Sequence, residues 1–236
     1  MNKSQRVWAI VPAAGIGSRM KADKPKQYLE IDNKTVLEHT LSRLLLVPSL
    51  EKIFVALQAD DVIWPSLDIS RHPKIESVAG GQSRHQSVAN CLKQCQGQAS
   101  SNDWILVHDA ARPCVSGLKI KELLKRIKDH PVGGILASPA SDTLKRINAD
   151  FEIIETVDRS SLYRAHTPQI FRYQILVDAF VNLQHKKITP TDEAMAVEAD
   201  GKQPFVLEDS KTNIKITESE DLYLAQLIMA MQRQVH

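Results

Sequence analysis

The chain has 236 residues, of which 43% are hydrophobic and 25% charged, as in an ordinary globular protein with a substantial core. Its 30 Lys and Arg against 28 Asp and Glu leave a formal net charge of +2, which argues against a nucleic-acid-binding protein with a broad basic surface. No apolar run is long enough to span a membrane, and residues 1–6 contain no apolar signal core, so we expect no membrane association and a cytoplasmic location. The cysteines lack zinc-ligand spacing and are predicted to be free buried thiols: Cys91, Cys95 and Cys114.

An apolar run at residues 7–11 predicts a strand that is buried on both faces of a parallel sheet. A loop of small residues follows, made of Pro12, Ala13, Ala14, Gly15 and Gly17. Such a loop lets a ligand approach the backbone, whose N–H groups can hold phosphate. The cations that follow it are Arg19, Lys21, Lys24 and Lys26. Together the loop and the cations indicate an anionic ligand.

The spacing of this loop excludes two common phosphate-binding motifs. The dinucleotide motif G-x-G-x-x-G would need a third glycine where this chain has Met20, and the P-loop spacing does not fit. An NAD-dependent oxidoreductase is therefore disfavoured. From spacing alone, a plain strand-to-helix turn with a solvated basic flank remains the alternative to a phosphate site.

The next segments alternate between helix and strand. Apolar spacing at 35–47 predicts a helix that ends before Pro48, and residues 53–57 predict a second buried strand. Strand, helix, strand in this order predicts a parallel sheet with right-handed crossovers.

A Gly80-Gly81 turn lies between a short predicted strand and an amphipathic helix. The glycines again permit close approach of a ligand to the backbone. The alternative is a simple turn in which Ser83 or Ser87 caps the helix.

The apolar run at 104–107 predicts a third buried strand, which is followed by the string H-D-A-A-R-P. Open α/β sheets bind ligands at the carboxyl ends of their strands, so Asp109 is a candidate ligand-binding residue. Mg²⁺ prefers one or two carboxylates plus substrate phosphates, so Asp109 is a candidate metal ligand when a nucleotide is bound. The alternative for Asp109 is an ion pair with Arg112.

Residues 133–139 predict a further strand, and two β-rich runs then flank Asn148-Ala149-Asp150. This pattern predicts a protruding β-hairpin arm at about 140–160. A hairpin of this length cannot bury both faces alone, so the arm should pack on another surface, the alternative being its own sheet. No internal repeat or linker is present, and we expect one domain, residues 1–236, plus the arm.

The last part of the chain contains further local signals. A helix is expected after T-D-E-A, with Thr191 or Asp192 as its cap, and residues 205–207 predict a short strand. Residues 217–220 have the pattern of a capping box for a final helix. On spacing alone, Lys215 is a solvated lysine.

Several strings resemble those of the nucleotidyltransferases that build sugar nucleotides and CDP-alcohols, specifically the 2-C-methyl-D-erythritol 4-phosphate cytidylyltransferase family of the non-mevalonate isoprenoid route. They are P-A-A-G-x-G-x-R-M, K-P-K-Q-Y, G-G-x-x-R-x-x-S-V, H-D-A-A-R-P, T-P-Q, T-D-E-A and N-I-K-x-T. The resemblance implies a Rossmann-like α/β fold with a mostly parallel sheet, helices on both faces and a β-hairpin dimerisation arm. It also implies transfer of CMP from CTP to the alcohol phosphate, Mg²⁺ bound with CTP, no tightly bound organic cofactor, and a homodimer.

The resemblance assigns roles to individual residues. Arg19 and Lys26 would stabilise the transition state, while Lys215 and Arg159 of the other subunit would align the alcohol phosphate. The nucleotide would contact Pro12, Ala13, Ala14, Gly15, Gly17, Gly81, Ser87 and Asp109, and Asp109 would hold Mg²⁺. The alcohol phosphate would contact Arg112, Thr143, Thr167 and Thr191.

Two departures and two alternatives qualify the resemblance. Family members commonly carry an acidic residue where this chain has Gln82 or Ser83, and often glycine where it has Asp209. A cytidylyltransferase for another polyol phosphate, such as ribitol 5-phosphate, would share the same loop and H-D-A-A-R-P string. A non-catalytic interaction protein that uses the arm would form a dimer but release no pyrophosphate.

Overall fold

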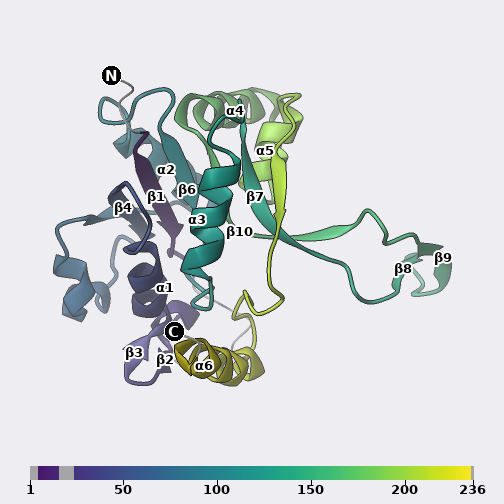
Figure 1. Cartoon of the computed structure of the whole chain (residues 1–236), viewed down its shortest axis with the longest axis horizontal. Coiled ribbons are helices and arrows are strands. Elements are labelled where there is room, and N and C mark those ends of the chain that lie inside the picture. The colour runs from purple at the N-terminus through teal and green to yellow at the C-terminus, as the bar shows by residue number, and fades with distance from the viewer. Residues whose placement is uncertain (1–4, 16–23, 235–236) are drawn as a thin grey trace.

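The computed structural model describes residues 5–15 and 24–234. Within this part of the chain, a seven-stranded sheet has the order β11-β7-β10-β6-β1-β4-β5 (Figure 1). Its strands are β1 (Val7–Pro12), β4 (Leu50–Leu57), β5 (Ile75–Ala79), β6 (Trp104–Val107), β7 (Gly133–Pro139), β10 (Tyr163–Arg172) and β11 (Phe205–Glu208). Strand β10 is antiparallel to β6 and β7, whereas the other neighbours pair in parallel. The predicted mostly parallel sheet is confirmed.

Helices cover both faces of this sheet, as expected. They are α1 (Val36–Leu44), α2 (Arg84–Gln94), α3 (Gly117–Arg126), α4 (Tyr173–Lys186), α5 (Glu193–Ala199) and α6 (Ser219–Gln234). Alternate residues of β1 point to opposite faces: Ala9 packs in one core with α1 and α3, and Ile10 packs in the other with α2, α4 and α5. Helix α6 packs outside these two cores, in a cluster that contains Val36 and Ile216. None of the described helices is both long and apolar enough to cross a membrane.

The helix boundaries show what local signals predicted and what they missed. Helix α1 begins after Thr35, whose side chain forms a capping box with Glu38. Helix α3 was not predicted. The capping box predicted from residues 217–220 is wrong, because α6 begins at Ser219 and it is Asp221 that accepts from the Thr217 N–H and hydroxyl, both at 2.8 Å. The cysteines are buried and form no disulfide in the part of the chain that the structure describes.

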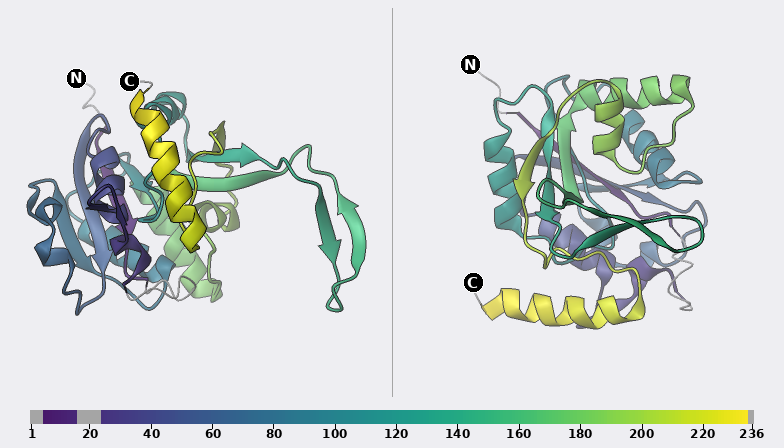
Figure 2. Two further views of the ribbon diagram at one scale, coloured as in Figure 1. Left: turned by 90° about the horizontal axis from the view of Figure 1, so that it is seen from below. Right: turned by 90° about the vertical axis from the view of Figure 1, so that its right-hand side faces the viewer.

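The hairpin made of β8 (Leu144–Ile147) and β9 (Ile153–Val157) projects away from the seven-stranded sheet (Figures 1 and 2). It does not fold back on its own sheet, so that alternative is wrong. Exposed apolar side chains gather on this arm: Leu144, Ile147, Phe151, Ile153 and Ile154. A single chain therefore leaves the arm without an apolar surface to cover it.

Candidate active site

A pocket of about 230 Å³ opens at the carboxyl ends of β1, β5 and β6. It is lined by Pro12, Ala13, Ala14, Gly15, Lys26, Gln27, Gly81, Gln82, Ser83, Arg84, Ser87, Asp109, Ala110, Ala111 and Lys215. A neighbouring depression of about 830 Å³ shares Ala14, Gly15, Gly81 and Gln82 with it and extends past the end of β4. The structure thus brings together most of the nucleotide-binding residues predicted from sequence, while Gly17 and Arg19 lie outside the described residues.

The loop after β1 packs closely against the turn after β5. A Cβ atom on Gly80 would lie 2.4 Å from the Cβ of Ala14 and 3.0 Å from the carbonyl oxygen of Leu57. Only glycine fits there without displacing the loop. The adjoining Gly81 N–H donates to the hydroxyl of Ser87 at 3.1 Å. Ser87 is buried and holds this turn in place, and Ser83, not Ser87, caps α2.

The segment that carries Lys26 also holds the loop after β1 in place. The side chain of Gln27 donates from Nε2 to the carbonyl oxygen of Ala13 at 2.7 Å. Lys26 and Gln27 begin a short 3-10 helix, η2 (Lys26–Tyr28). The loop is therefore held by its own chain on two sides before any ligand arrives, which reduces the ordering cost of binding.

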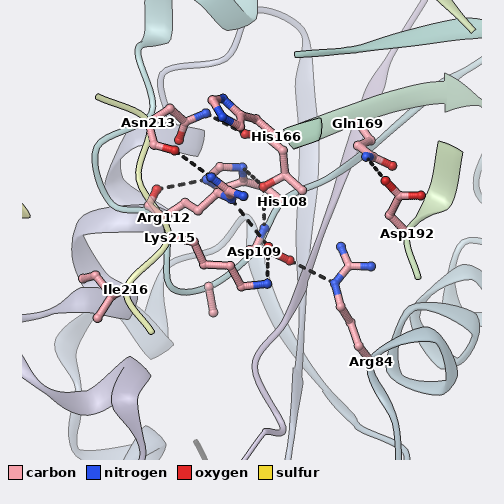
Figure 3. A network of polar contacts seen from close by, with 12 residues as sticks. Arg84, His108, Asp109, Arg112, His166, Gln169, Asp192, Asn213, Lys215 and Ile216 are labelled. Atoms are coloured by element: carbon pink, nitrogen blue, oxygen red, sulfur yellow. Dashed lines mark hydrogen bonds and ion pairs between the residues drawn. The ribbon is translucent and has the colours of Figure 1, made fainter. Parts of the chain in front are cut away.

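Three cations surround Asp109, which follows β6 (Figure 3). Its carboxylate lies 2.9 Å from Arg84 Nε, 2.8 Å from Lys215 Nζ and 3.6 Å from Arg112 Nε. Burial acts to raise the pKa of Asp109, but Arg84, Lys215 and Arg112 outweigh it and hold that pKa well below its usual range. The ion pair with Arg112 considered from the sequence is present, but it is the longest of the three.

Lys215 and Lys26 reach this pocket from opposite ends of the chain. Lys26 donates from Nζ to the carbonyl oxygen of Ile216 at 3.2 Å, and the Ile216 N–H donates to the carbonyl oxygen of Ala111 at 2.9 Å. Lys215 is paired with Asp109 and lines the pocket, so the interpretation of Lys215 as a solvated lysine is wrong. Two ammonium groups are thus directed to one rim of the pocket.

Thr167 is buried behind the pocket and is not among the residues that line it in one chain. Its hydroxyl accepts from the Asp109 N–H at 3.0 Å and is hydrogen-bonded to Nδ1 of His108 at 2.9 Å. Burial lowers the pKa of His108 to about 4, so this imidazole is neutral at pH 7. Thr167 therefore supports the loop that carries Asp109.

The other residues predicted to contact the alcohol phosphate are dispersed. Arg112 is buried, and its Nη1 donates to the carbonyl oxygen of Asn213 at 2.6 Å. Thr143 and Arg159 are exposed on the arm, and Thr191 is exposed beside Asp192, which caps α5. In one chain none of these four residues lines the pocket.

Two charged residues of the site were not identified from the sequence: Arg84 and Glu193. Arg84 bridges Asp109 and Glu193, with guanidinium contacts of 2.7 and 3.0 Å to the two carboxylate oxygens of Glu193. Glu193 is 1% exposed, so Arg84 compensates its buried charge. The signal was available, because Arg84 is the arginine of G-G-x-x-R and Glu193 the glutamate of T-D-E-A.

Mg²⁺ was predicted to bind at Asp109. In the described part of the chain, no group of three or more His, Cys, Asp or Glu side chains could hold a metal ion. Asp109 is the one carboxylate among the described pocket-lining residues. Its oxygens have acceptor positions beyond those used by Arg84 and Lys215. The site therefore fits Mg²⁺ as an ion carried by a polyphosphate, with Asp109 as one ligand.

Comparisons with known proteins agree with this geometry. The family model described as IspD: 2-C-methyl-D-erythritol 4-phosphate cytidylyltransferase matches residues 7–231. The chain is 47% identical over 225 residues to the 2-C-methyl-D-erythritol 4-phosphate cytidylyltransferase of Vibrio vulnificus (strain CMCP6), a match that covers 95% of each chain. It is 49% identical over 225 residues to the protein of that name from Vibrio parahaemolyticus, covering 95% of this chain and 96% of the relative.

Solved structures give the same result. A crystal structure of 4-diphosphocytidyl-2C-methyl-D-erythritol synthase is similar with a TM-score of 0.83 at 35% identity, covering 97% of this chain and 100% of that one. The Francisella tularensis 2-C-methyl-D-erythritol 4-phosphate cytidylyltransferase has a TM-score of 0.80 at 39% identity, covering 94% and 99%. The sequence match across nearly the whole chain and the shared fold show that the chain belongs to the 2-C-methyl-D-erythritol 4-phosphate cytidylyltransferase family.

Proposed function

We propose that this chain transfers the cytidylyl group of CTP to 2-C-methyl-D-erythritol 4-phosphate, giving 4-diphosphocytidyl-2-C-methyl-D-erythritol and pyrophosphate. The observation that carries the proposal is the convergence of Lys26 and Lys215 on a small-residue loop at the carboxyl ends of the parallel strands, in a member of this family. The relatives named above carry this activity in their names, and no observation favours ribitol 5-phosphate as the acceptor.

The reaction is an in-line displacement at the α-phosphorus of CTP. A phosphate oxygen of the acceptor forms the new P–O bond, and the bond to the β-phosphate oxygen breaks as pyrophosphate leaves. The acceptor phosphate is already an anion at neutral pH, so the step needs no general base. The barrier is mainly electrostatic, and positioning together with fixed positive charge lowers it.

The pocket supplies these elements from different parts of the chain. Backbone groups of the 12–15 loop and Gly81 would hold the nucleotide, and Gly17 is proposed to contact it as well. Lys26 and Arg19 would stabilise charge on the α-phosphate and the leaving group. Lys215 would align the acceptor phosphate, and its ion pair with Asp109 keeps it directed into the pocket before substrates bind.

Mg²⁺ is proposed to enter with the triphosphate of CTP, with Asp109 as its protein ligand. When bound, the ion supplies positive charge to the phosphate oxygens. The low pKa of Asp109 keeps the carboxylate ionised at neutral pH, as a metal ligand must be.

A homodimer formed through the arm is also proposed. Phe151 is 85% exposed and Ile153 63% exposed at the end of the hairpin, and a second copy would cover such surface. Arg159 and Thr143 lie on this arm, so the same contact would bring them to the acceptor phosphate of the partner. Arg112 and Thr191 are proposed to complete that acceptor site.

Thr167 is proposed to belong to the acceptor site as well, and its hydroxyl accepts from the Asp109 N–H and so also supports that carboxylate. A cytoplasmic location is proposed because the buried free thiols suit a reducing compartment.

Pyrophosphate release from purified protein tests the proposed activity. With CTP and Mg²⁺, 2-C-methyl-D-erythritol 4-phosphate should support release, and ribitol 5-phosphate should support far less. Equal rates with the two acceptors would remove the assigned specificity. A protein that dimerises without releasing pyrophosphate would support the non-catalytic alternative.

A further inference from the structure

The segment between β11 and α6 carries Lys215 yet has no regular structure of its own. Residues 209–216, all of them described, contain neither helix nor strand. A lysine with four rotatable bonds on such a segment loses much conformational freedom when it is directed at one point. The position of Lys215 therefore depends on contacts elsewhere in the segment.

A buried polar network fixes the start of this segment. Oδ2 of Asp209 accepts from Asn213 Nδ2 at 2.7 Å and lies 2.9 Å from His166 Nδ1. Asn213 Nδ2 also donates to the carbonyl oxygen of Thr167 at 2.9 Å, and the Asn213 carbonyl oxygen accepts from Arg112. Figure 3 shows Asn213 and His166 beside Arg112, on the side of the cluster from which Lys215 extends to Asp109.

The network also reaches the root of the arm. Nε2 of His166, on β10, lies 3.2 Å from the hydroxyl of Ser138, on β7. Strand β7 leads into the arm and β10 leads out of it (Figure 1). Asp209 thus connects the paired strands at the root of the arm with the segment that carries Lys215.

Ser138, His166 and Asp209 have the connectivity of a hydrolytic triad, but they cannot act as one here. Ser138 is 0% exposed, so its hydroxyl has no access to a substrate. A nucleophile must reach the reacting carbonyl or phosphoryl atom. The contacts of this network lead instead toward Lys215.

We propose that Asp209 and His166 are positioning residues that hold the 209–216 segment so that Lys215 meets the acceptor phosphate. Asp209 orients Asn213, whose carbonyl oxygen is tied to Arg112, and Lys215 follows two residues later. His166 orients the Asp209 carboxylate and joins it to β7 through Ser138. This role rests on the proposed cytidylyl transfer, because it assigns Lys215 to the acceptor of that reaction.

A double-mutant cycle between Asp209 and Lys215 tests the proposal, with Asp209→Asn as the nearly isosteric change. Asp209→Asn should lower kcat/KM about tenfold, which corresponds to about 1.4 kcal/mol, with the KM for CTP unchanged. Lys215→Ala should lower kcat/KM further, and the Asp209→Asn, Lys215→Ala double variant should have the same kcat/KM as Lys215→Ala alone. Glu208→Gln is the matched control, because Glu208 is the exposed neighbour and should show wild-type rates.

The outcomes separate this role from a general effect on folding. His166→Ala should give the same non-additive result with Lys215→Ala, and thermal unfolding should show that each variant is folded at the assay temperature. Wild-type rates in Asp209→Asn, or losses that add fully to that of Lys215→Ala, would overturn the proposal. If the wild-type protein itself releases no pyrophosphate with 2-C-methyl-D-erythritol 4-phosphate, the proposed function fails, and the role of Asp209 and His166 in placing Lys215 at the acceptor fails with it.

Discussion

Replacing Arg84 by alanine should destabilise the fold, because Arg84 compensates two buried carboxylates. Its guanidinium contacts Glu193 at 2.7 and 3.0 Å and Asp109 at 2.9 Å. Asp109 keeps Lys215 and Arg112 in the variant, whereas Glu193 keeps no cation among the contacts described. Breaking a buried ion pair by removing one partner costs about 3–5 kcal/mol. The side chain of Arg84 is 27% exposed, so we expect the lower end, about 3 kcal/mol.

The loss should depend on pH in a defined direction. Burial raises the pKa of Glu193, and Arg84 opposes that rise. Without Arg84, the folded state binds a proton at Glu193 more tightly than the unfolded state does, so lowering the pH favours the folded variant. The deficit in the free energy of unfolding should therefore shrink as the pH falls from about 7 to about 5, toward the ordinary pKa of a glutamate.

Urea unfolding followed by circular dichroism measures this prediction at the two pH values. Arg71→Ala is the matched control, because its ion pair with Asp68 lies at the surface and should contribute less than about 1 kcal/mol. Adding Glu193→Gln to Arg84→Ala should recover part of the stability at pH 7, since it removes the uncompensated charge. A deficit like that of Arg71→Ala, or one that grows as the pH falls, would refute the reasoning.

Three further predictions concern the loop, the shared site and the thiols. Gly80→Ala should raise the KM for CTP and lower the free energy of unfolding in urea by about 1–3 kcal/mol, because the new Cβ would meet Ala14 at 2.4 Å. The control is Gly117→Ala, which should leave that KM unchanged because nothing lies within 4 Å of the added Cβ. Lys26→Ala should lower kcat about 10²-fold with the fold intact. Mixing this variant with inactive Arg159→Ala subunits should restore some pyrophosphate release if the active site is shared through the arm, and no recovery would count against a shared site. Burial raises the pKa of each cysteine thiol to about 12, so a thiol reagent at about pH 8 should label the unfolded chain but not the folded one. Rapid labelling of the folded protein would contradict this.

Much of the fold could be predicted from short stretches of sequence. The apolar run at 104–107 became β6 and that at 53–57 became the end of β4, because a buried strand needs little more than β-forming apolar residues in sequence. The hairpin at about 140–160 was also visible, since two β-rich runs around Asn148-Ala149-Asp150 form a local signal. The capping box predicted at residues 217–220 is wrong, because Asp221 and not Glu220 accepts from the Thr217 N–H and hydroxyl, and spacing alone does not distinguish two adjacent carboxylates.

Some residues of the candidate site could be predicted from sequence, whereas its ion pairs could not, because their partners come from distant parts of the chain. Sequence alone directed attention to Asp109, to the loop at 12–15 and, through family resemblance, to Lys215 and Lys26. It did not identify Arg84 and Glu193 as a pair, because they are far apart in sequence and meet only when α2 and α5 pack on the same face of the sheet. It also did not show that the Thr167 hydroxyl is hydrogen-bonded to the Asp109 N–H and to His108, since these residues lie far apart in sequence.

The sequence by itself determined the local parts: which runs are strands, where the small-residue loop lies and that a hairpin leaves the sheet. Only the tertiary structure decided which cations surround Asp109 and which residues hold the Lys215 segment. The physical reason is the distance along the chain over which each interaction acts. Propensity and turn formation act between neighbours in sequence, whereas compensation of a buried charge depends on side chains that the sheet order brings together.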